Sequence, residues 1–217
     1  MTRESEILDG LYENTLDGNA QPVLDLTNEG LALGMSPMTL LFDAMIPALE
    51  EVGRLFEIGE YFVPEMLISA RAMQGAMAIL RPLIAETGAK PIGTFIMGTV
   101  KGDIHDIGKN LCNTMLEGAG FVVVDLGVNV APETFIEAIQ EHKPNAVGMS
   151  AFLTTTMPMF KLTIQAIANA GLREQVKILV GGAPVTQEYA DAVGADGYAP
   201  EASSCVRLTK KLIGAAE

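Results

Sequence analysis

One short segment of this 217-residue sequence, residues 102–108, combines side chains that can do chemistry. At its centre is His105, one of only two histidines in the chain, with Asp103 two residues before it. A carboxylate at that spacing can accept the proton of one imidazole nitrogen and so orient the ring. Gly102 and Gly108 allow a ligand to approach the backbone closely. An aspartate-oriented histidine in such a loop predicts either a metal ligand or a general base.

The competing interpretation of this segment is structural. A helix that starts after the loop and is capped by Asp106 would close a turn or bind an anion at its N-terminus, without any metal. A metal held only by the protein's side chains is disfavoured, because no other histidine, cysteine or carboxylate cluster stands at ligand spacing from His105. A single protein ligand suits a metal that arrives with its remaining ligands already in a macrocycle.

The composition disfavours several classes of function. A net charge of −13 and a pI near 4.5 oppose binding to nucleic acid, which is driven by lysine and arginine contacts to phosphate. No apolar run approaches the roughly 20 residues of a membrane span, and the acidic start lacks the pattern of a secretory signal. The two cysteines, Cys112 and Cys205, make no disulfide framework. We therefore predict a cytoplasmic protein with no nucleic-acid or membrane partner.

Residues 4–85 have the apolar spacing of three and four residues that is typical of helices. The strongest start signal is Ser36-Pro37, a capping hydroxyl followed by proline at the first helical position. Four helices joined by short turns predict an antiparallel four-helix bundle, which we expect as a domain over residues 1–87. The helices are expected at residues 7–16, 23–33, 36–56 and 63–85.

Beyond a polar, turn-rich linker at residues 86–91, short apolar runs alternate with helical stretches. This alternation predicts an α/β domain over residues 91–217, with a five-stranded parallel sheet of the Rossmann-like (flavodoxin-like) type. Ligands of such sheets bind at the carboxyl ends of the strands, at the topological switch point, so the loops after the strands should carry the site. We expect strands at residues 92–99, 121–125, 146–150, 177–180 and 197–199, and helices at 108–117, 132–142, 157–170, 186–193 and 201–213.

Two further loops of this kind hold hydroxyl residues or glycines. Residues 150–156 follow the third expected strand and read Ser-Ala-Phe-Leu-Thr-Thr-Thr, and a Gly181-Gly182 pair follows the fourth. Each has a structural explanation of its own, since hydroxyl residues cap helices and a glycine pair is an ordinary turn. Their appearance together, in this order, favours one ligand site shared by all three loops.

The string Asp103-x-His105-x-x-Gly108 resembles the signature of B12-binding domains that hold cobalamin with its own base displaced and a histidine in its place. The resemblance implies that His105 is the lower axial ligand of cobalt. Thr156 stands where methionine synthases place the serine of a His–Asp–Ser proton relay, which implies that His105, Asp103 and Thr156 are the catalytic residues. A proton taken up by this relay would weaken the bond from imidazole to cobalt and couple protonation to the redox state of the metal.

The same family has a Ser-x-Leu segment after its third strand; here Ser150 matches the serine, and Phe152 stands where leucine is usual. Gly181 and Gly182 are similar to the paired glycines that let the displaced nucleotide tail run into the sheet. The resemblance therefore implies cofactor contacts from all three loops. They are Gly102, Asp103, Ile104, His105, Asp106, Gly108, Ser150, Phe152, Thr154, Thr156, Gly181 and Gly182.

The helical half resembles the cap of methionine synthase and of the small corrinoid proteins of methanogens and acetogens, chiefly in residues 55–66 and 69–73. One stripe of its last helix, at helical spacing, consists of Phe62, Met66, Ala70 and Met73. By pattern alone such a stripe belongs to the core of the bundle. The resemblance implies instead that the stripe covers the upper face of the corrinoid.

The resemblance also implies a function: a corrinoid carrier subunit of a methyltransferase system, with no catalysis of its own without partners. In that family cobalt cycles between Co(I) and methyl-Co(III), the state found in methylcobalamin. The implied partners are a substrate-specific methyltransferase, a methylcorrinoid:acceptor methyltransferase and a reductive activator of Co(II). The acceptor would be a molecule such as tetrahydrofolate or a thiol.

Three alternatives remain open from the sequence. An adenosylcobalamin-binding subunit of a mutase shares the histidine loop but usually lacks the helical cap. A B12-sensing regulator shares both, but it also carries a DNA-binding segment and a tryptophan-containing cap motif, and this sequence has no tryptophan. A plain nucleotide-binding module, in which Asp103 and His105 are incidental, would be colourless.

Overall fold

The computed structural model describes residues 2–86 and 91–215. The chain divides into two compact units, Met1–Lys90 and Pro91–Glu217. Most of the predicted linker, residues 86–91, lies outside the described residues, as do residues 1, 87, 216 and 217 at the ends of the predicted domains. In the described ranges, no helix is both long enough and apolar enough to cross a membrane.

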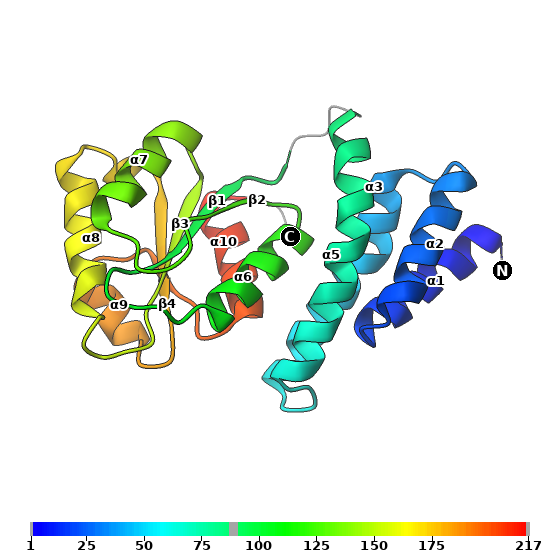
Figure 1. The fold of residues 1–217 in the computed structure, drawn as a ribbon, viewed down its shortest axis with the longest axis horizontal. Helices are drawn as coiled ribbons and strands as arrows, with labels where there is room; N and C mark the ends of the chain where they lie inside the picture. The colour runs from blue at the N-terminus through cyan, green and yellow to red at the C-terminus, as the bar shows by residue number, and fades with distance from the viewer. Residues whose placement is uncertain (1, 87–90, 216–217) are drawn as a thin grey trace. The chain divides into compact units, whose positions relative to one another are not determined.

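The first unit is built from helices joined by short turns (Figure 1). The predicted start of the third helix is confirmed, because the Ser36 hydroxyl accepts a hydrogen bond from the backbone N–H of Met38 at 3.2 Å and Pro37 occupies the first turn. The predicted helical fold of this region is confirmed. Its helices are α1 (Arg3–Leu16), α2 (Ala20–Ala32), α3 (Pro37–Leu40), α4 (Ile46–Glu57) and α5 (Val63–Glu86).

The third predicted helix is continuous but not uniform, because a π-helical segment, η1 (Leu41–Met45), joins α3 to α4. Pro47 lies in the first turn of α4. In a regular α-helix its ring would clash with the carbonyl of Asp43, four residues earlier, and it has no N–H to donate. A wider π turn relieves this conflict. Apolar spacing alone does not distinguish an α turn from a π turn, so the sequence predicted one plain helix here.

The helices α1, α2 and α5 pack against one another at points of close approach. Gly18, in the turn after α1, has φ +74°, and a Cβ there would come within 2.5 Å of the side chain of Ile68 on α5. The hydroxyl of Ser69 donates to the backbone carbonyl of Leu16 at 2.7 Å. These contacts fix α5 against the end of α1. Fully buried apolar side chains of the unit include Ile7, Leu11, Val23, Leu40, Met45 and Leu80.

The second unit contains a five-stranded parallel sheet with the strand order β2-β1-β3-β4-β5. This is the flavodoxin-like order, so the predicted fold class is confirmed. The third strand matches its predicted bounds, and the others differ from theirs by one or two residues at an end. The strands are β1 (Thr94–Thr99), β2 (Val122–Asp125), β3 (Ala146–Ser150), β4 (Lys177–Gly181) and β5 (Gly197–Tyr198).

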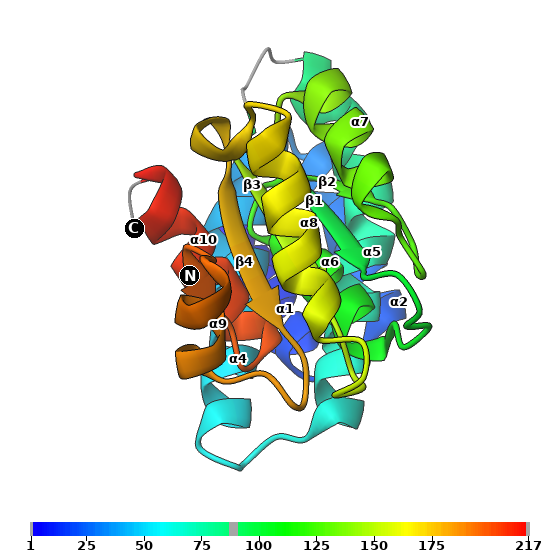
Figure 2. The same cartoon turned by 90° about the vertical axis from the view of Figure 1, so that its left-hand side faces the viewer.

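Helices cover both faces of this sheet, with α7, α8 and α9 on one face and α6 and α10 on the other (Figure 1). Figure 2 looks onto the first of these faces, where α8 lies in front of the strands. There Phe135 of α7 and Phe160 of α8 are fully buried against Ile96 and Val147 of the sheet. The helices are α6 (Ile107–Gly118), α7 (Pro132–His142), α8 (Pro158–Asn169), α9 (Gln187–Val193) and α10 (Ala202–Ile213); a short 3-10 helix, η2 (Arg173–Gln175), was not predicted.

The topological switch point lies between β1 and β3, which pair in the middle of the sheet. Thr99 and Ser150, the last residues of these strands, are register partners. After β1 the chain continues into α6 on one face, and after β3 into α8 on the other. The two connecting loops, residues 100–106 and 151–157, therefore lie side by side at the carboxyl edge of the sheet, where such folds bind ligands.

Candidate functional site

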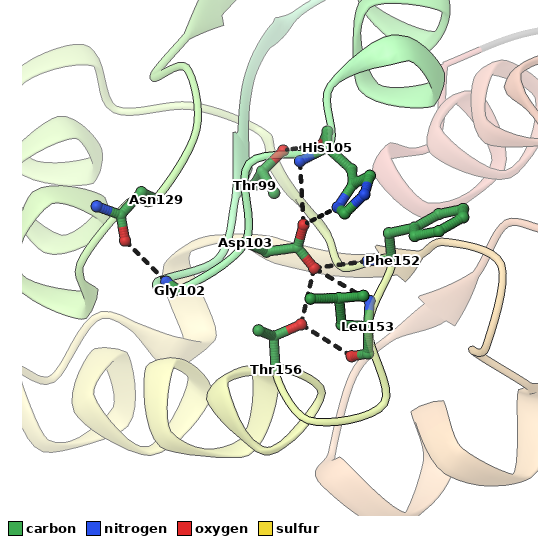
Figure 3. Close-up of polar contacts among 8 residues, drawn as sticks. All are labelled: Thr99, Gly102, Asp103, His105, Asn129, Phe152, Leu153 and Thr156. Atoms are coloured by element: carbon green, nitrogen blue, oxygen red, sulfur yellow. Dashed lines mark hydrogen bonds and ion pairs between the residues drawn. The ribbon is translucent and has the colours of Figure 1, made fainter.

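The centre of the site is a hydrogen-bonded pair in the loop between β1 and α6 (Figure 3). Nδ1 of His105 lies 2.8 Å from Oδ1 of Asp103, and the backbone N–H of His105 donates to the same oxygen at 3.0 Å. Asp103 is fully buried, whereas the His105 side chain is 46% exposed. Because Nδ1 faces the carboxylate, Nε2 is the nitrogen that the ring can present to a metal.

The second oxygen of Asp103 is held by the loop after β3 (Figure 3). Oδ2 accepts hydrogen bonds from the hydroxyl of Thr156 at 2.7 Å and from the backbone N–H groups of Phe152 at 2.8 Å and Leu153 at 3.2 Å. The three residues predicted to form a relay, His105, Asp103 and Thr156, are thus brought together. The Thr156 hydroxyl also lies 2.8 Å from the Leu153 carbonyl, which competes for its single proton.

These hydrogen bonds decide the charge of Asp103. Burial by itself would raise the pKa of its carboxyl group, but donation from the backbone of His105, the hydroxyl of Thr156, the backbone of Phe152 and the imidazole outweighs it and holds the pKa well below its usual range. Asp103 is therefore an ionised acceptor at neutral pH, and the proton it faces is carried by Nδ1 of His105. This arrangement fixes the tautomer of a neutral imidazole.

Two residues that the sequence did not single out support the loop from behind (Figure 3). The hydroxyl of Thr99, at the end of β1, donates to the backbone carbonyl of His105 at 3.0 Å. Asn129, in the loop after β2, accepts from the backbone N–H of Gly102 at 2.8 Å, and its own N–H donates to the carbonyl of Asp103 at 2.9 Å. Asn129 has φ +55°, a left-handed conformation that asparagine tolerates better than most residues. This tolerance was the only feature of the sequence that could have indicated a structural role for Asn129.

An ion pair between a buried lysine and an exposed aspartate, which the sequence also failed to indicate, secures the start of α6. The side chain of Lys109 is 1% exposed, and its Nζ lies 2.7 Å from both carboxylate oxygens of Asp125 at the end of β2. A cation in the first turn of a helix is opposed by the helix dipole, and the carboxylate offsets this. Asp125 also accepts from the backbone N–H of Gly127 at 2.9 Å. The loop after β2 is thereby tied to the helix that follows His105.

Four large apolar side chains near His105 are exposed, although apolar groups of this size are usually buried. They come from the loops after β1 and β3 and from the first turn of α6. Phe152 also stacks on the imidazole of His105, with ring centroids 4.3 Å apart and planes inclined by 27°. Exposed apolar residues gathered beside one available imidazole nitrogen suit a large ligand with apolar surface. The four are Ile104, Ile107, Phe152 and Leu153.

The predicted glycines after β4 have a packing role of their own. Gly182 has φ +128°, and a Cβ there would stand 1.9 Å from the backbone oxygen of Ala151 in the loop after β3. A Cβ on Gly181 would come within 2.9 Å of the carbonyl oxygen of Ala199. Glycine at these two positions therefore lets neighbouring loops approach closely, and the predicted contact of this pair with a cofactor stays a prediction.

The remaining predicted residues are distributed less uniformly. Asp106 stands at the N-cap position of α6, but the expected side-chain cap is wrong: its carboxylate instead accepts from the side chain of Asn110 at 3.1 Å. Ser150 is half-buried and Thr154 is exposed. Of the predicted stripe, Met66, Ala70 and Met73 lie on α5 and are buried, while Phe62 precedes the helix and is 64% exposed. Its predicted role as a cofactor cover stays a prediction.

No group of three or more histidine, cysteine, aspartate or glutamate residues within the described ranges could hold a metal ion. The fold and the oriented imidazole define a class, that of doubly wound α/β proteins with a ligand site at the carboxyl edge of the sheet.

Comparison with known proteins identifies the family. Two family models, each described as a B12 binding domain, match residues 93–206 and residues 7–81. The chain is 40% identical to the trimethylamine corrinoid protein of Methanosarcina barkeri over 212 residues, which cover 97% of this chain and 98% of that protein. The chain therefore belongs to the B12-binding domain family, and its cofactor is a corrinoid.

Solved structures agree with this assignment at 28% sequence identity. The chain in the crystal structure of the methanol:cobalamin methyltransferase complex MtaBC from Methanosarcina barkeri matches with a TM-score of 0.83, over 97% of this chain and 81% of that chain. A cobalamin-binding protein from Desulfitobacterium hafniense DCB-2 matches with a TM-score of 0.80, over 94% of this chain and 98% of that one. Both likenesses extend over the helical unit as well as the sheet unit.

Proposed function

We propose that this chain is the corrinoid carrier subunit of a methyltransferase system. The observation that carries the proposal is the pair of His105 and ionised Asp103, with Nε2 presented beside exposed apolar side chains at the switch point of the sheet. When bound, the corrinoid supplies a cobalt that can accept a methyl group and release it to a second molecule. Relatives named for trimethylamine and dimethylamine systems support this role.

The residues present fit such a cofactor. His105 would hold the cobalt of such a cofactor through Nε2. The exposed side chains of Ile104, Ile107 and Leu153 offer apolar surface to a macrocycle. Further contacts are proposed for Gly102, Asp106, Gly108, Ser150, Phe152, Thr154, Gly181 and Gly182, and for Phe62, Met66, Ala70 and Met73 of the helical unit.

The contribution of this chain to the chemistry is to orient a ligand and hold a proton. Asp103 keeps the proton on Nδ1 of His105, which makes Nε2 the basic nitrogen. Thr156 donates to the other oxygen of Asp103 and stabilises its charge. As a relay, His105, Asp103 and Thr156 would share an added proton, which would weaken the hold of the imidazole on a bound metal.

The rest of the assignment is proposed on the same basis. Residues 1–87 would form a cap domain and residues 91–217 the cofactor-binding domain. One methyltransferase would load the cofactor, and a second would pass the methyl group to tetrahydrofolate or a thiol, with a reductive activator restoring oxidised cobalt. A chain similar to this one is part of the methanol:cobalamin methyltransferase complex MtaBC, which supports a methyltransferase partner that loads the cofactor.

The experiment that tests the proposal is an absorption spectrum of the protein after reconstitution with cobalamin. The wild type should retain the cofactor with a spectrum typical of histidine coordination, and His105→Ala should lose that spectrum. The chain offers a matched control in His142→Ala, because His142 is the only other histidine and lies at the end of α7. The methylated holoprotein should then be demethylated by a methylcorrinoid:thiol methyltransferase. Wild-type protein that retains no cobalamin would contradict the proposal.

A further inference from the structure

Phe152 contacts both members of the central pair at once (Figure 3). Its backbone N–H donates to Oδ2 of Asp103 at 2.8 Å, and its ring stacks on the imidazole of His105 at a centroid distance of 4.3 Å. The residue comes from the loop after β3, whereas the pair comes from the loop after β1. Phe152 therefore joins the two loops at the point where Nε2 is presented.

The orientation of the imidazole needs more than its hydrogen bond to Asp103. That bond fixes the position of Nδ1, but it leaves the ring able to tilt about the Nδ1–Oδ1 direction, and the His105 side chain is 46% exposed. A ring stacked on one face opposes this tilt, because tilting would break contact over the whole face. The tilt in turn decides where Nε2 points, which matters because a ligand must be held close to its productive geometry.

Core packing does not explain the ring of Phe152. Its residue is 52% exposed, so the aromatic surface contributes little to the buried core of the sheet unit. An exposed phenylalanine carries a hydrophobic cost that a smaller or polar residue would avoid. Its planar face stacks on the imidazole of His105.

We propose that Phe152 is a positioning residue, which sets the plane of the His105 imidazole and so directs Nε2 toward the cobalt. The inference rests on the proposed function for its cobalt, but the stacking itself is a property of the protein alone. Phe152→Leu is the informative variant, since leucine is apolar and keeps the backbone N–H but has no planar face. Phe152→Tyr keeps the planar face and should therefore keep the stacking on His105.

The first measurement uses the protein without cofactor. The chain has two histidines, so a spectrum of protein with isotopically labelled histidine contains two sets of ring signals, and His142→Ala assigns them. The ring protons of His105 should be shifted upfield by the Phe152 ring current. The shift should disappear in Phe152→Leu, persist in Phe152→Tyr, and persist in Leu162→Ala, which removes an apolar side chain of similar exposure on α8.

The second measurement uses protein reconstituted with cobalamin and reduced to Co(II). Electron paramagnetic resonance reports one axial nitrogen as a superhyperfine splitting, and labelling the histidines of the protein with nitrogen-15 changes this splitting only where the nitrogen belongs to His105 rather than to the cofactor's own base. The fraction of cobalt bound by His105 should fall in Phe152→Leu at equal cofactor loading and return in Phe152→Tyr. Equal fractions in the wild type and Phe152→Leu would overturn the positioning role while leaving the proposed function intact. Wild-type protein that takes up cobalamin without nitrogen splitting would overturn both, and the two failures are therefore distinguishable.

Discussion

The hydroxyl of Thr156 offers the sharpest test of how the site is held together. Asp103 is a fully buried carboxylate with five donors, and the one from Thr156, at 2.7 Å, is the shortest. Thr156→Val keeps the shape of the side chain and removes this donor. Hydrogen bonds to charged groups contribute about 1.5–3 kcal/mol. Since four donors remain, we expect a loss of about 2 kcal/mol in the free energy of unfolding.

The chain contains a matched control for this substitution. Thr163, on α8 of the same unit, is also fully buried, but its hydroxyl has no hydrogen-bond partner among the residues that the structure describes. Thr163→Val replaces an unsatisfied hydroxyl by a methyl group and should be neutral or stabilising. Thr156→Ser retains the donor and should recover most of the stability lost in Thr156→Val. Only the methyl group that lies 3.6 Å from a Cβ position on Gly102 is lost.

The assay is urea denaturation of the cofactor-free protein, monitored by circular dichroism. The unfolding free energies of the variants are compared where the slope of that free energy with urea concentration is the same. Thr156→Val should be clearly less stable than Thr163→Val. If the two threonine-to-valine substitutions have the same effect, or if Thr156→Val costs less than about 0.5 kcal/mol, the hydroxyl does not stabilise the Asp103 carboxylate and the relay geometry is wrong.

Three further predictions concern the residues around this pair. Because the pKa of Asp103 is lowered in the folded protein, its charge stabilises the fold fully above the ordinary aspartate pKa of about 3.9 and progressively less as the pH falls below that value. The difference in stability between the wild type and Asp103→Asn should therefore shrink on acidification from pH 6 to 3. Acid titrations of both proteins would show this. Asn129→Gly loses the acceptor for the backbone N–H of Gly102 but tolerates φ +55°, whereas Asn129→Ala loses the same acceptor and also strains the backbone. In denaturant unfolding, the alanine variant should be about 1 kcal/mol less stable than the glycine variant. Equal stabilities would contradict the strain. Gly194→Ala should cost roughly 1–2 kcal/mol, because Gly194 has a positive φ. Gly182→Ala should cost well over this, because its φ is also positive and the new Cβ would stand 1.9 Å from a backbone oxygen. Thermal melts of the two variants test the difference.

The sequence by itself determined the architecture of the sheet unit. Strictly local patterns, such as the apolar run at residues 146–150 and the helix at 132–142, match the observed bounds of β3 and α7. The alternation of strands and helices then predicted a parallel sheet. A parallel sheet of this type in turn predicted the edge at which ligands bind. His105 and Asp103 could be selected because a histidine is rare in this chain and an aspartate at that spacing can orient it.

Tertiary structure alone decided what holds this pair in place. Thr99 and Asn129 hold the loop through hydrogen bonds to its backbone, and Lys109 pairs with Asp125. Such partners are set by how the strand ends meet in space. The same holds for the stacking of Phe152 on His105, because the two residues are 47 positions apart in the sequence and only the pairing of β1 with β3 brings their loops together. Local periodicity predicts which face of a helix or strand is apolar. It does not predict which loops lie side by side in the folded protein.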